Sequence, residues 1–224
     1  MMFGHLDAYA GDPILSLNEA FQKDPRADKV NLSIGIYFDD AGRIPVLDCV
    51  RRAEQAMLSA SAPKSYLPIE GEAAMRGAVQ LLLFGAGHEV LASGRVATLQ
   101  TVGSSGGLKV GADFLKRWLP ASEVWVSDPT WDNHRAMFEG AGVAVHTYPY
   151  YDAGSGGLRF DALLETLRGC HCACLVTAHT EYRKADLARI ARVMAHPLMI
   201  DGRNALGTPP ASLQVITLGR SHAQ

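Results

Sequence analysis

The chain has 224 residues, of which 48% are hydrophobic and 20% charged, with a formal net charge of −2. This length suffices to bury one sizeable core, and the balanced charge argues against nucleic acid or an anionic membrane as a general partner. The sequence has no run of about 18 apolar residues that would span a membrane, and its start lacks the basic and apolar pattern of a signal peptide. We therefore predict a cytoplasmic globular protein.

In chain order, the first 45 residues are rich in loop-forming residues and show little hydrophobic periodicity. We expect them to need packing from the rest of the chain or from a second copy. Helical periodicity follows in four segments, in which apolar residues recur every three or four positions. These segments are 47–57, 108–119, 160–167 and 187–194.

Short apolar runs bounded by Gly, Pro and Asp lie between these segments and predict strands. They cover residues 96–102, 123–127, 143–148, 172–177, 198–200 and 215–218, and loops are expected at 61–68, 152–157 and 207–210. Strands that alternate with helices form a mostly parallel sheet with helices on both faces. The predicted fold class is α/β.

Three of the four cysteines, Cys170, Cys172 and Cys174, alternate along one predicted strand, so their side chains share a face. His171 and His179 lie nearby, which makes a metal site conceivable. No second cluster completes tetrahedral coordination, however, and we predict no metal. Small thiols buried in a core strand are the preferred interpretation.

The segment Thr101-Val-Gly-Ser-Ser-Gly-Gly-Leu-Lys109 follows a predicted strand and opens an amphipathic helix. Free N–H groups at a helix start attract anions, glycines let a ligand approach the backbone closely, and Ser104 and Ser105 add hydroxyl donors. Such a loop could hold a phosphate, although Gly/Ser turns often have a purely structural role. The segment matches neither G-x-G-x-x-G nor the P-loop.

Two further segments carry aromatic side chains. Ser127-Asp-Pro-Thr-Trp-Asp-Asn-His134 follows an apolar strand, where ligands bind in open α/β sheets, and Trp131 could stack on a planar heteroaromatic ring. A partly buried core tryptophan is the alternative, and His134 alone is more often a surface or capping residue. Tyr66-Leu-Pro-Ile-Glu-Gly71 is a proline-rigid turn that, taken alone, is an ordinary loop.

Together, in this order, the three segments resemble one family, the class I aminotransferases of the aromatic and aspartate type. The resemblance extends over residues 3–168 and includes TLQTVGSSGGLKVGADFLKRW and VWVSDPTWDNHRAMFEGAGV. It implies transfer of an amino group from an amino acid to a 2-oxo acid with pyridoxal 5'-phosphate. It also implies that residues 1–45 form an arm and part of a small domain, and residues 46–169 part of the large cofactor-binding domain.

The resemblance implies roles for individual residues. Ser104, Ser105 and Gly106, with the surrounding N–H groups, would hold the cofactor phosphate. Trp131 would stack on the pyridine ring, with His134 close behind it.

Two residues nearer the N-terminus are assigned in the same way. Gly35 would lie where the backbone lines the substrate carboxylate, and Tyr66 would reach the phosphate of a partner subunit's cofactor, which implies a homodimer.

The resemblance ends before the family's cofactor-binding lysine, its pyridine-pairing aspartate and its substrate-binding arginines. The last lysine, Lys184 in HTEYRKADL, does not resemble the family's Ser-x-Ser-Lys segment. Because such enzymes use a lysine both as the covalent anchor and as the base, we predict a catalytically deficient protein with no catalytic residue of its own. Any cofactor would be bound noncovalently.

Residues 173–220 resemble instead the C-terminal end of nucleotide-sugar (UDP-sugar) dehydrogenases, through TAHTEYR, DLARI and IDGRN. Residues 170–224 would then be an α/β tail joined near Gly169, and Arg203 could contact a nucleotide sugar. The NAD-binding glycine motif of those enzymes is absent, so no NAD-linked oxidation is expected. Two alternatives follow: a non-enzymatic nucleotide-sugar-binding module, or a non-functional chimeric fragment.

Overall fold

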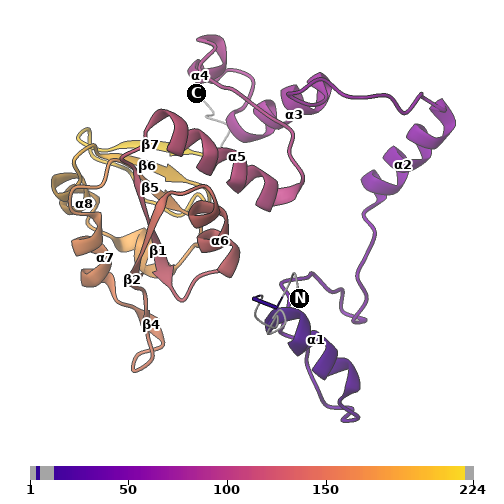
Figure 1. The fold of residues 1–224 in the computed structure, drawn as a ribbon, viewed down its shortest axis with the longest axis horizontal. Coiled ribbons are helices and arrows are strands. Elements are labelled where there is room, and N and C mark those ends of the chain that lie inside the picture. The colour runs from indigo at the N-terminus through magenta and orange to yellow at the C-terminus, as the bar shows by residue number, and fades with distance from the viewer. Residues whose placement is uncertain (1–3, 6–12, 220–224) are drawn as a thin grey trace. The chain divides into compact units, whose positions relative to one another are not determined.

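The computed structural model describes residues 4–5 and 13–219 (Figure 1). The chain forms two compact units, residues 1–65 and 66–224. The predicted domain limits after residues 45 and 169 rest on the two resemblances and stay predictions.

The first unit contains two helices, α1 (Pro13–Lys23) and α2 (Asp48–Ala60). Helix α2 confirms the helix predicted at 47–57, whereas α1 lies in the segment for which no helix was predicted. Asp48 in the first turn of α2 forms ion pairs with Arg51 and Arg52, as expected for an acidic residue at a helix start. None of the described residues of this unit is buried, so local interactions rather than a core hold these helices.

The second unit begins with three helices before its first strand. They are α3 (Ala73–Phe84), α4 (Glu89–Ala92) and α5 (Gly103–Trp118). Helix α5 confirms the periodicity at 108–119. The strand predicted at 96–102 is wrong, because this segment pairs with no strand among the described residues. Its hydrogen bonds go to turns and helices instead, as when the Gln100 N–H donates to the carbonyl of Glu70 at 2.9 Å.

The parallel strands of this unit lie in two sheets (Figure 1). Strand β1 (Glu123–Asp128) pairs with β2 (Ala144–Pro149), and α6 (Asp132–Gly140) connects them. The second sheet has the order β5–β6–β7, with β5 (Ala173–Leu175), β6 (Leu198–Asp201) and β7 (Gln214–Thr217). The α/β class with parallel strands is confirmed.

Shorter elements complete the unit. A hairpin of β3 (Tyr151–Asp152) and β4 (Gly157–Leu158) encloses the predicted loop at 152–157. Helix α7 (Phe160–Leu167) and helix α8 (Leu187–Val193) confirm the two predicted C-terminal helices, and a 3₁₀ helix, η1 (Thr180–Lys184), lies between β5 and α8.

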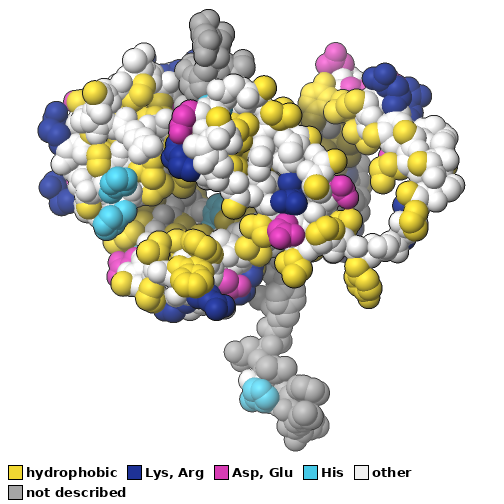
Figure 2. Space-filling view, turned by 90° about the horizontal axis from the view of Figure 1, so that it is seen from above, with side chains coloured by type: hydrophobic (Ala, Val, Ile, Leu, Met, Phe, Trp, Pro, Cys, Tyr) yellow, Lys and Arg dark blue, Asp and Glu magenta, His cyan; other side chains and the backbone are white. Residues whose placement is uncertain are grey.

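The hydrophobic core lies mainly in the C-terminal part of the second unit. One cluster joins α7 and α8 to β6 through buried side chains that include Leu164, Ile190 and Met199. A smaller cluster contains Leu175, Tyr182 and Ala205. Large hydrophobic side chains are also frequent on the surface, as Figure 2 shows for one face of the molecule.

The prediction that Cys170, Cys172 and Cys174 are buried in a core strand is wrong. Cys172 and Cys174 are exposed and Cys170 is half-buried, because Ala173 and Leu175 are the β5 residues that face the core clusters. No group of three metal-ligating side chains occurs among the described residues, and no helix there is long and apolar enough to cross a membrane.

Candidate functional site

The N-terminus of α5 is an anion-attracting feature built from the Gly/Ser segment. Gly103 adopts a φ of +62°, a conformation that glycine accepts without strain, and the chain enters the helix there. The N-cap residue, Val102, has no side-chain acceptor, and the first turn carries no acidic residue. Among the described residues, none accepts a hydrogen bond from the N–H groups of Ser104 and Ser105. These amides are therefore available to an external anion, at the positive end of the helix dipole.

Trp131 lies at the N-cap of α6, beyond the carboxyl end of β1. Its side chain is 39% exposed, and the His134 ring meets it edge-on, with 5.4 Å between the ring centroids. The His134 Nδ1 atom lies 2.8 Å from the Thr130 hydroxyl, which fixes the imidazole ring. His134 thus supports the indole from one side and leaves part of it open to a ligand.

A hydrogen bond that the sequence did not reveal joins these two features. The Asn133 Nδ2 atom donates to the Ser105 hydroxyl at 3.3 Å, so the N-termini of α5 and α6 are connected. Ser105 and Trp131 therefore belong to one local arrangement. The sequence carries only a faint signal of it, because Asn133 is one of many polar residues in helix first turns.

The Tyr66 turn is fastened to the segment that precedes α5. Gly71 has a φ of +89°, and the Gln100 side chain occupies the space that a Cβ atom on Gly71 would need, 2.2 Å from its ideal position. The Gln100 Oε1 atom accepts a hydrogen bond from the Glu72 N–H at 2.9 Å. Tyr66 itself is fully exposed at the start of this turn. Gly35 is exposed in the first unit and has open space around it.

A cluster of aromatic side chains at the carboxyl ends of β2 and β5 was also missed. The Tyr150 hydroxyl and the His179 Nε2 atom are hydrogen-bonded, and the His179 ring also meets Tyr182 at 5.7 Å between centroids. Tyr148 meets Tyr150 edge-on. Burial is the main cause that raises the pKa of the Tyr148, Tyr150 and Tyr182 phenols, so all three are neutral donors at physiological pH.

Arg203 lies on a turn organised by Asp201. The Asp201 carboxylate is 1% exposed and accepts hydrogen bonds from the N–H groups of Arg203, Ala205 and Leu206. The Arg203 residue is exposed. Asp201 is thus committed to its own turn, which explains the regular backbone of the IDGRN segment.

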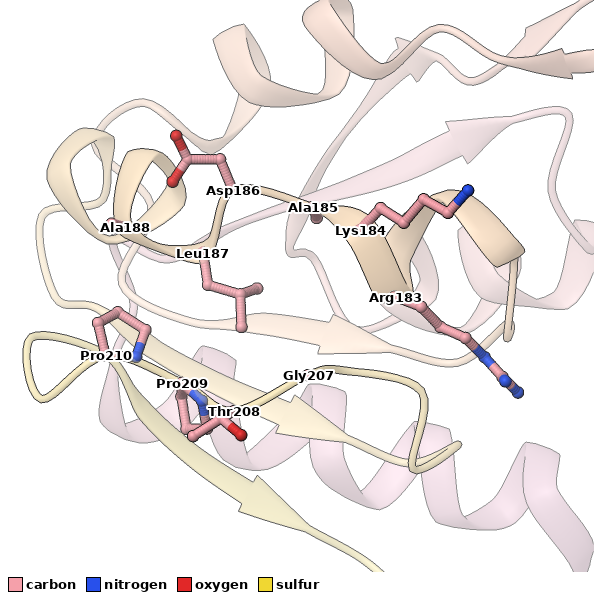
Figure 3. Close-up of a pocket in the computed structure, with 10 residues that line it drawn as sticks. All are labelled: Arg183, Lys184, Ala185, Asp186, Leu187, Ala188, Gly207, Thr208, Pro209 and Pro210. Atoms are coloured by element: carbon pink, nitrogen blue, oxygen red, sulfur yellow. The ribbon is translucent and has the colours of Figure 1, made fainter.

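A shallow depression of about 480 Å³ lies elsewhere in the same tail (Figure 3). Residues 183–188 form one wall and residues 207–210 the other. Leu187 points toward Pro209, whereas Lys184 extends away from that loop (Figure 3). Arg203 does not line this depression, so the structure does not combine the two into one site.

Comparison with known proteins identifies the class to which this architecture belongs. The family model for aminotransferase class I and II matches residues 27–180. The chain is 56% identical to tyrosine aminotransferase of Klebsiella pneumoniae and 57% identical to aromatic-amino-acid aminotransferase of Escherichia coli, over 180 residues in each case. An aromatic amino acid aminotransferase of Burkholderia cenocepacia superimposes with a TM-score of 0.75 at 53% identity, over 89% of this chain.

The chain belongs to the class I and II aminotransferase family. It covers 45% of the length of the Klebsiella and Escherichia relatives and 53% of the Burkholderia structure, so it spans about half of these proteins. A solved aromatic-amino-acid aminotransferase of Burkholderia pseudomallei, 40% identical with a TM-score of 0.75, is covalently bound to pyridoxal phosphate.

Proposed function

We propose that this chain binds pyridoxal 5'-phosphate noncovalently, as half of an aromatic/aspartate-type aminotransferase site, and that it does not complete amino transfer by itself. One observation carries the proposal. The Ser104 and Ser105 amides, which have no acceptor among the described residues, lie next to the Asn133–Ser105 hydrogen bond that connects them to the helix presenting Trp131. A phosphate and a planar ring are the two parts of this cofactor that such an arrangement can recognise.

The residues present fit the phosphate. Two free N–H groups and two serine hydroxyls lie at the start of a 16-residue helix whose first turn has no competing carboxylate. Gly106 and Gly107 place no side chain over this turn. Backbone amides at a helix N-terminus bind phosphate through hydrogen bonds and the helix dipole together.

The residues present also fit the ring. Trp131 offers a partly open indole face, and His134 holds it from the edge. When bound, the cofactor supplies an electron-accepting ring for amino-group chemistry, and the protein supplies position and charge. The part that we assign to this chain is to grip the phosphate and orient the ring.

The proposed deficiency rests on the lysines of the second unit. Lys109 forms an ion pair with Asp113 along α5, Lys116 lies near the end of that helix, and Lys184 lies in η1. In residues 66–219, no lysine makes a hydrogen bond, ion pair or cation–π contact with Ser105 or Trp131. The amine that would anchor the cofactor and carry the proton is not supplied by this part of the chain.

Titration of the full chain with pyridoxal 5'-phosphate, followed by tryptophan fluorescence, tests the binding. We expect saturable binding that weakens about tenfold in Trp131→Ala, since an aromatic stacking contact contributes ~1.4 kcal/mol. Pyridoxal without the phosphate should bind at least about tenfold more weakly, because it cannot use the α5 amides. The matched control is Trp118→Ala, which removes an exposed tryptophan at the other end of α5. Equal affinity for the two ligands would refute the phosphate assignment.

Borohydride reduction of the loaded protein, followed by mass spectrometry, tests the deficiency. We expect no stoichiometric covalent adduct and no amino transfer between an aromatic amino acid and a 2-oxo acid. A stoichiometric adduct on a single lysine, or turnover at an enzymatic rate, would disprove the proposed deficiency while leaving the binding site intact.

Three assignments remain proposals by resemblance: Gly35 at a substrate carboxylate, Tyr66 at a partner subunit's cofactor, and the homodimer that Tyr66 implies. Nucleotide-sugar binding by the tail also stays a prediction, supported by an exposed Arg203 on a turn that Asp201 fixes. Calorimetry with a UDP-sugar on the wild-type chain and on Arg203→Ala checks it, with Arg192→Ala as an exposed control on α8.

A further inference from the structure

Two cysteines form a pair on the exposed face of β5. Ala173 and Leu175 turn toward the hydrophobic clusters, so the alternate residues Cys172 and Cys174 project from the opposite face. Both cysteines are exposed and lie two residues apart on this face, and the Cys172 Sγ atom donates to the Ala173 carbonyl at 4.0 Å. Strand β5 is at the edge of its sheet, so no further strand covers it on that side within the described chain.

We propose that Cys172 and Cys174 form a dithiol site that binds a soft trivalent centre, such as a trivalent arsenical, through both sulfur atoms at once. The site is separate from the proposed cofactor site and does not depend on it. Its recognition chemistry is the preference of soft electrophiles for sulfur, combined with two thiols that project from the same exposed face two residues apart.

The binding step is balanced without an oxidant. An organic arsenoxide, R–As=O, reacts with the two thiols to form two As–S bonds, and its oxygen leaves as water with the two thiol protons. Arsenic remains trivalent and both sulfurs keep their oxidation state. A single thiol cannot complete this exchange, so the ligand distinguishes a pair from an isolated cysteine.

The difference in pKa between the two thiols favours formation of the first As–S bond by Cys174. The hydrogen bond from Cys172 lowers the pKa of Cys174 to about 7 and raises the pKa of Cys172. The Cys174 sulfur is therefore the better nucleophile near neutral pH, because the thiolate is the reactive form. Cys172, which remains a thiol, then supplies the second sulfur from two residues away.

The third cysteine of the segment is held differently. The Cys170 Sγ atom donates to the Thr166 carbonyl at 3.2 Å, and burial raises the pKa of its thiol. Cys49 lies in α2 of the first unit, without a cysteine beside it in the sequence. These two cysteines are the matched controls.

The test is addition of phenylarsine oxide to the full-length wild-type chain, with intact mass and tryptic peptide mapping. Cleavage after Arg168 and Arg183 gives one peptide that contains all three cysteines of the segment. We expect one arsenical per chain on this peptide, with fragment ions placing it on Cys172 and Cys174. An adduct elsewhere, or none at all, overturns the proposal without any variant.

Four variants sharpen the result. Cys172→Ser and Cys174→Ser should each abolish the adduct, whereas Cys49→Ser and Cys170→Ser should retain it. Retention in Cys174→Ser, or loss in Cys170→Ser with an unchanged far-ultraviolet circular dichroism spectrum, would contradict the assigned pair. Because Cys172 and Cys174 are exposed, their replacement by serine should leave the fold intact.

Discussion

Within the second unit, the residues that carry the proposed cofactor site and the residues that carry the core are different. Among the described residues, all buried hydrophobic side chains except Ala112 and Val143 lie between Leu164 and Leu213. The segment that bears Ser105 and Trp131 is held mainly by hydrogen bonds, turns and a few packed side chains. The comparison teaches that the part of this unit from α7 onward supplies most of its packing, while the segment that contains the starts of α5 and α6 supplies the proposed ligand-binding groups.

The largest expected effect is a difference in amide hydrogen exchange between a helix of the first unit and a helix of the second. Helix α8 is packed into the core, whereas α2 has no buried residue among those described. We expect amide hydrogen exchange in α8 to be slower than in α2 by roughly 10³-fold, because exchange in an unpacked helix needs only local fraying. Mass spectrometry of peptides from the two helices measures it. Similar protection in both would show that α2 is buried by a contact outside the described structure.

The next largest effect is expected on the free energy of unfolding, when a substitution removes a side chain from the core. Ile190 is 3% exposed in the main cluster, so Ile190→Ala should lower the free energy of unfolding by about 3 kcal/mol, through lost burial and a cavity. The control, Leu82→Ala, shortens a side chain that is 76% exposed on α3 and should cost under about 0.5 kcal/mol. Urea denaturation measures both. Equal costs would contradict a core located in the tail.

Alkaline pH should weaken the tail through Tyr182. Burial raises the pKa of this phenol in the folded chain, whereas the unfolded chain ionises near pH 10. Its contribution to stability is therefore complete below about pH 10 and is lost as the pH rises further, by up to ~1.4 kcal/mol per pH unit. Denaturant melts between pH 9 and 11 should show this slope. It should be smaller in Tyr182→Phe and unchanged in Tyr37→Phe, an exposed control.

The smallest effect concerns the exposed face of the tail. Replacing Cys172 with alanine removes the hydrogen bond that lowers the pKa of Cys174. Alkylation of Cys174 by iodoacetamide at pH 7 should then slow about threefold, since the lost thiolate fraction is partly offset by a more nucleophilic sulfur. Peptide mapping over time measures the rate, and Cys49→Ala is the control. An unchanged rate would mean that the two thiols do not interact in solution.

Much of the fold could be predicted from periodicity, because amphipathic helices such as α5 and α7 repeat their apolar residues clearly. Helix α6 was missed since its sequence, DNHRAMFEG, is largely polar. The strand predicted at 96–102 failed because an apolar run specifies a strand only when a partner strand is available. The cysteine prediction failed for a related reason. Alternation places side chains on a common face but does not say which face is buried.

The candidate site was predictable in its parts and not in its connections. Ser105 and Trp131 stood out by residue type and position, beside a helix start and a strand end. The hydrogen bond from Asn133 to Ser105, and the fit of Gln100 against Gly71, join residues 28 and 29 positions apart. Such contacts depend on how helices and turns are placed in space, which neither propensity nor spacing encodes.

The fit between Gly71 and Gln100 has a consequence for communication along the chain. Gln100 is the residue immediately before Thr101, and its side chain and backbone both grip the turn that follows Tyr66. An event that orders the start of α5 therefore restrains the Tyr66 turn as well, through a linkage only a few bonds long. Tyr66 therefore lies at the start of a turn that is hydrogen-bonded to Gln100, three residues before the anion-attracting N-terminus of α5.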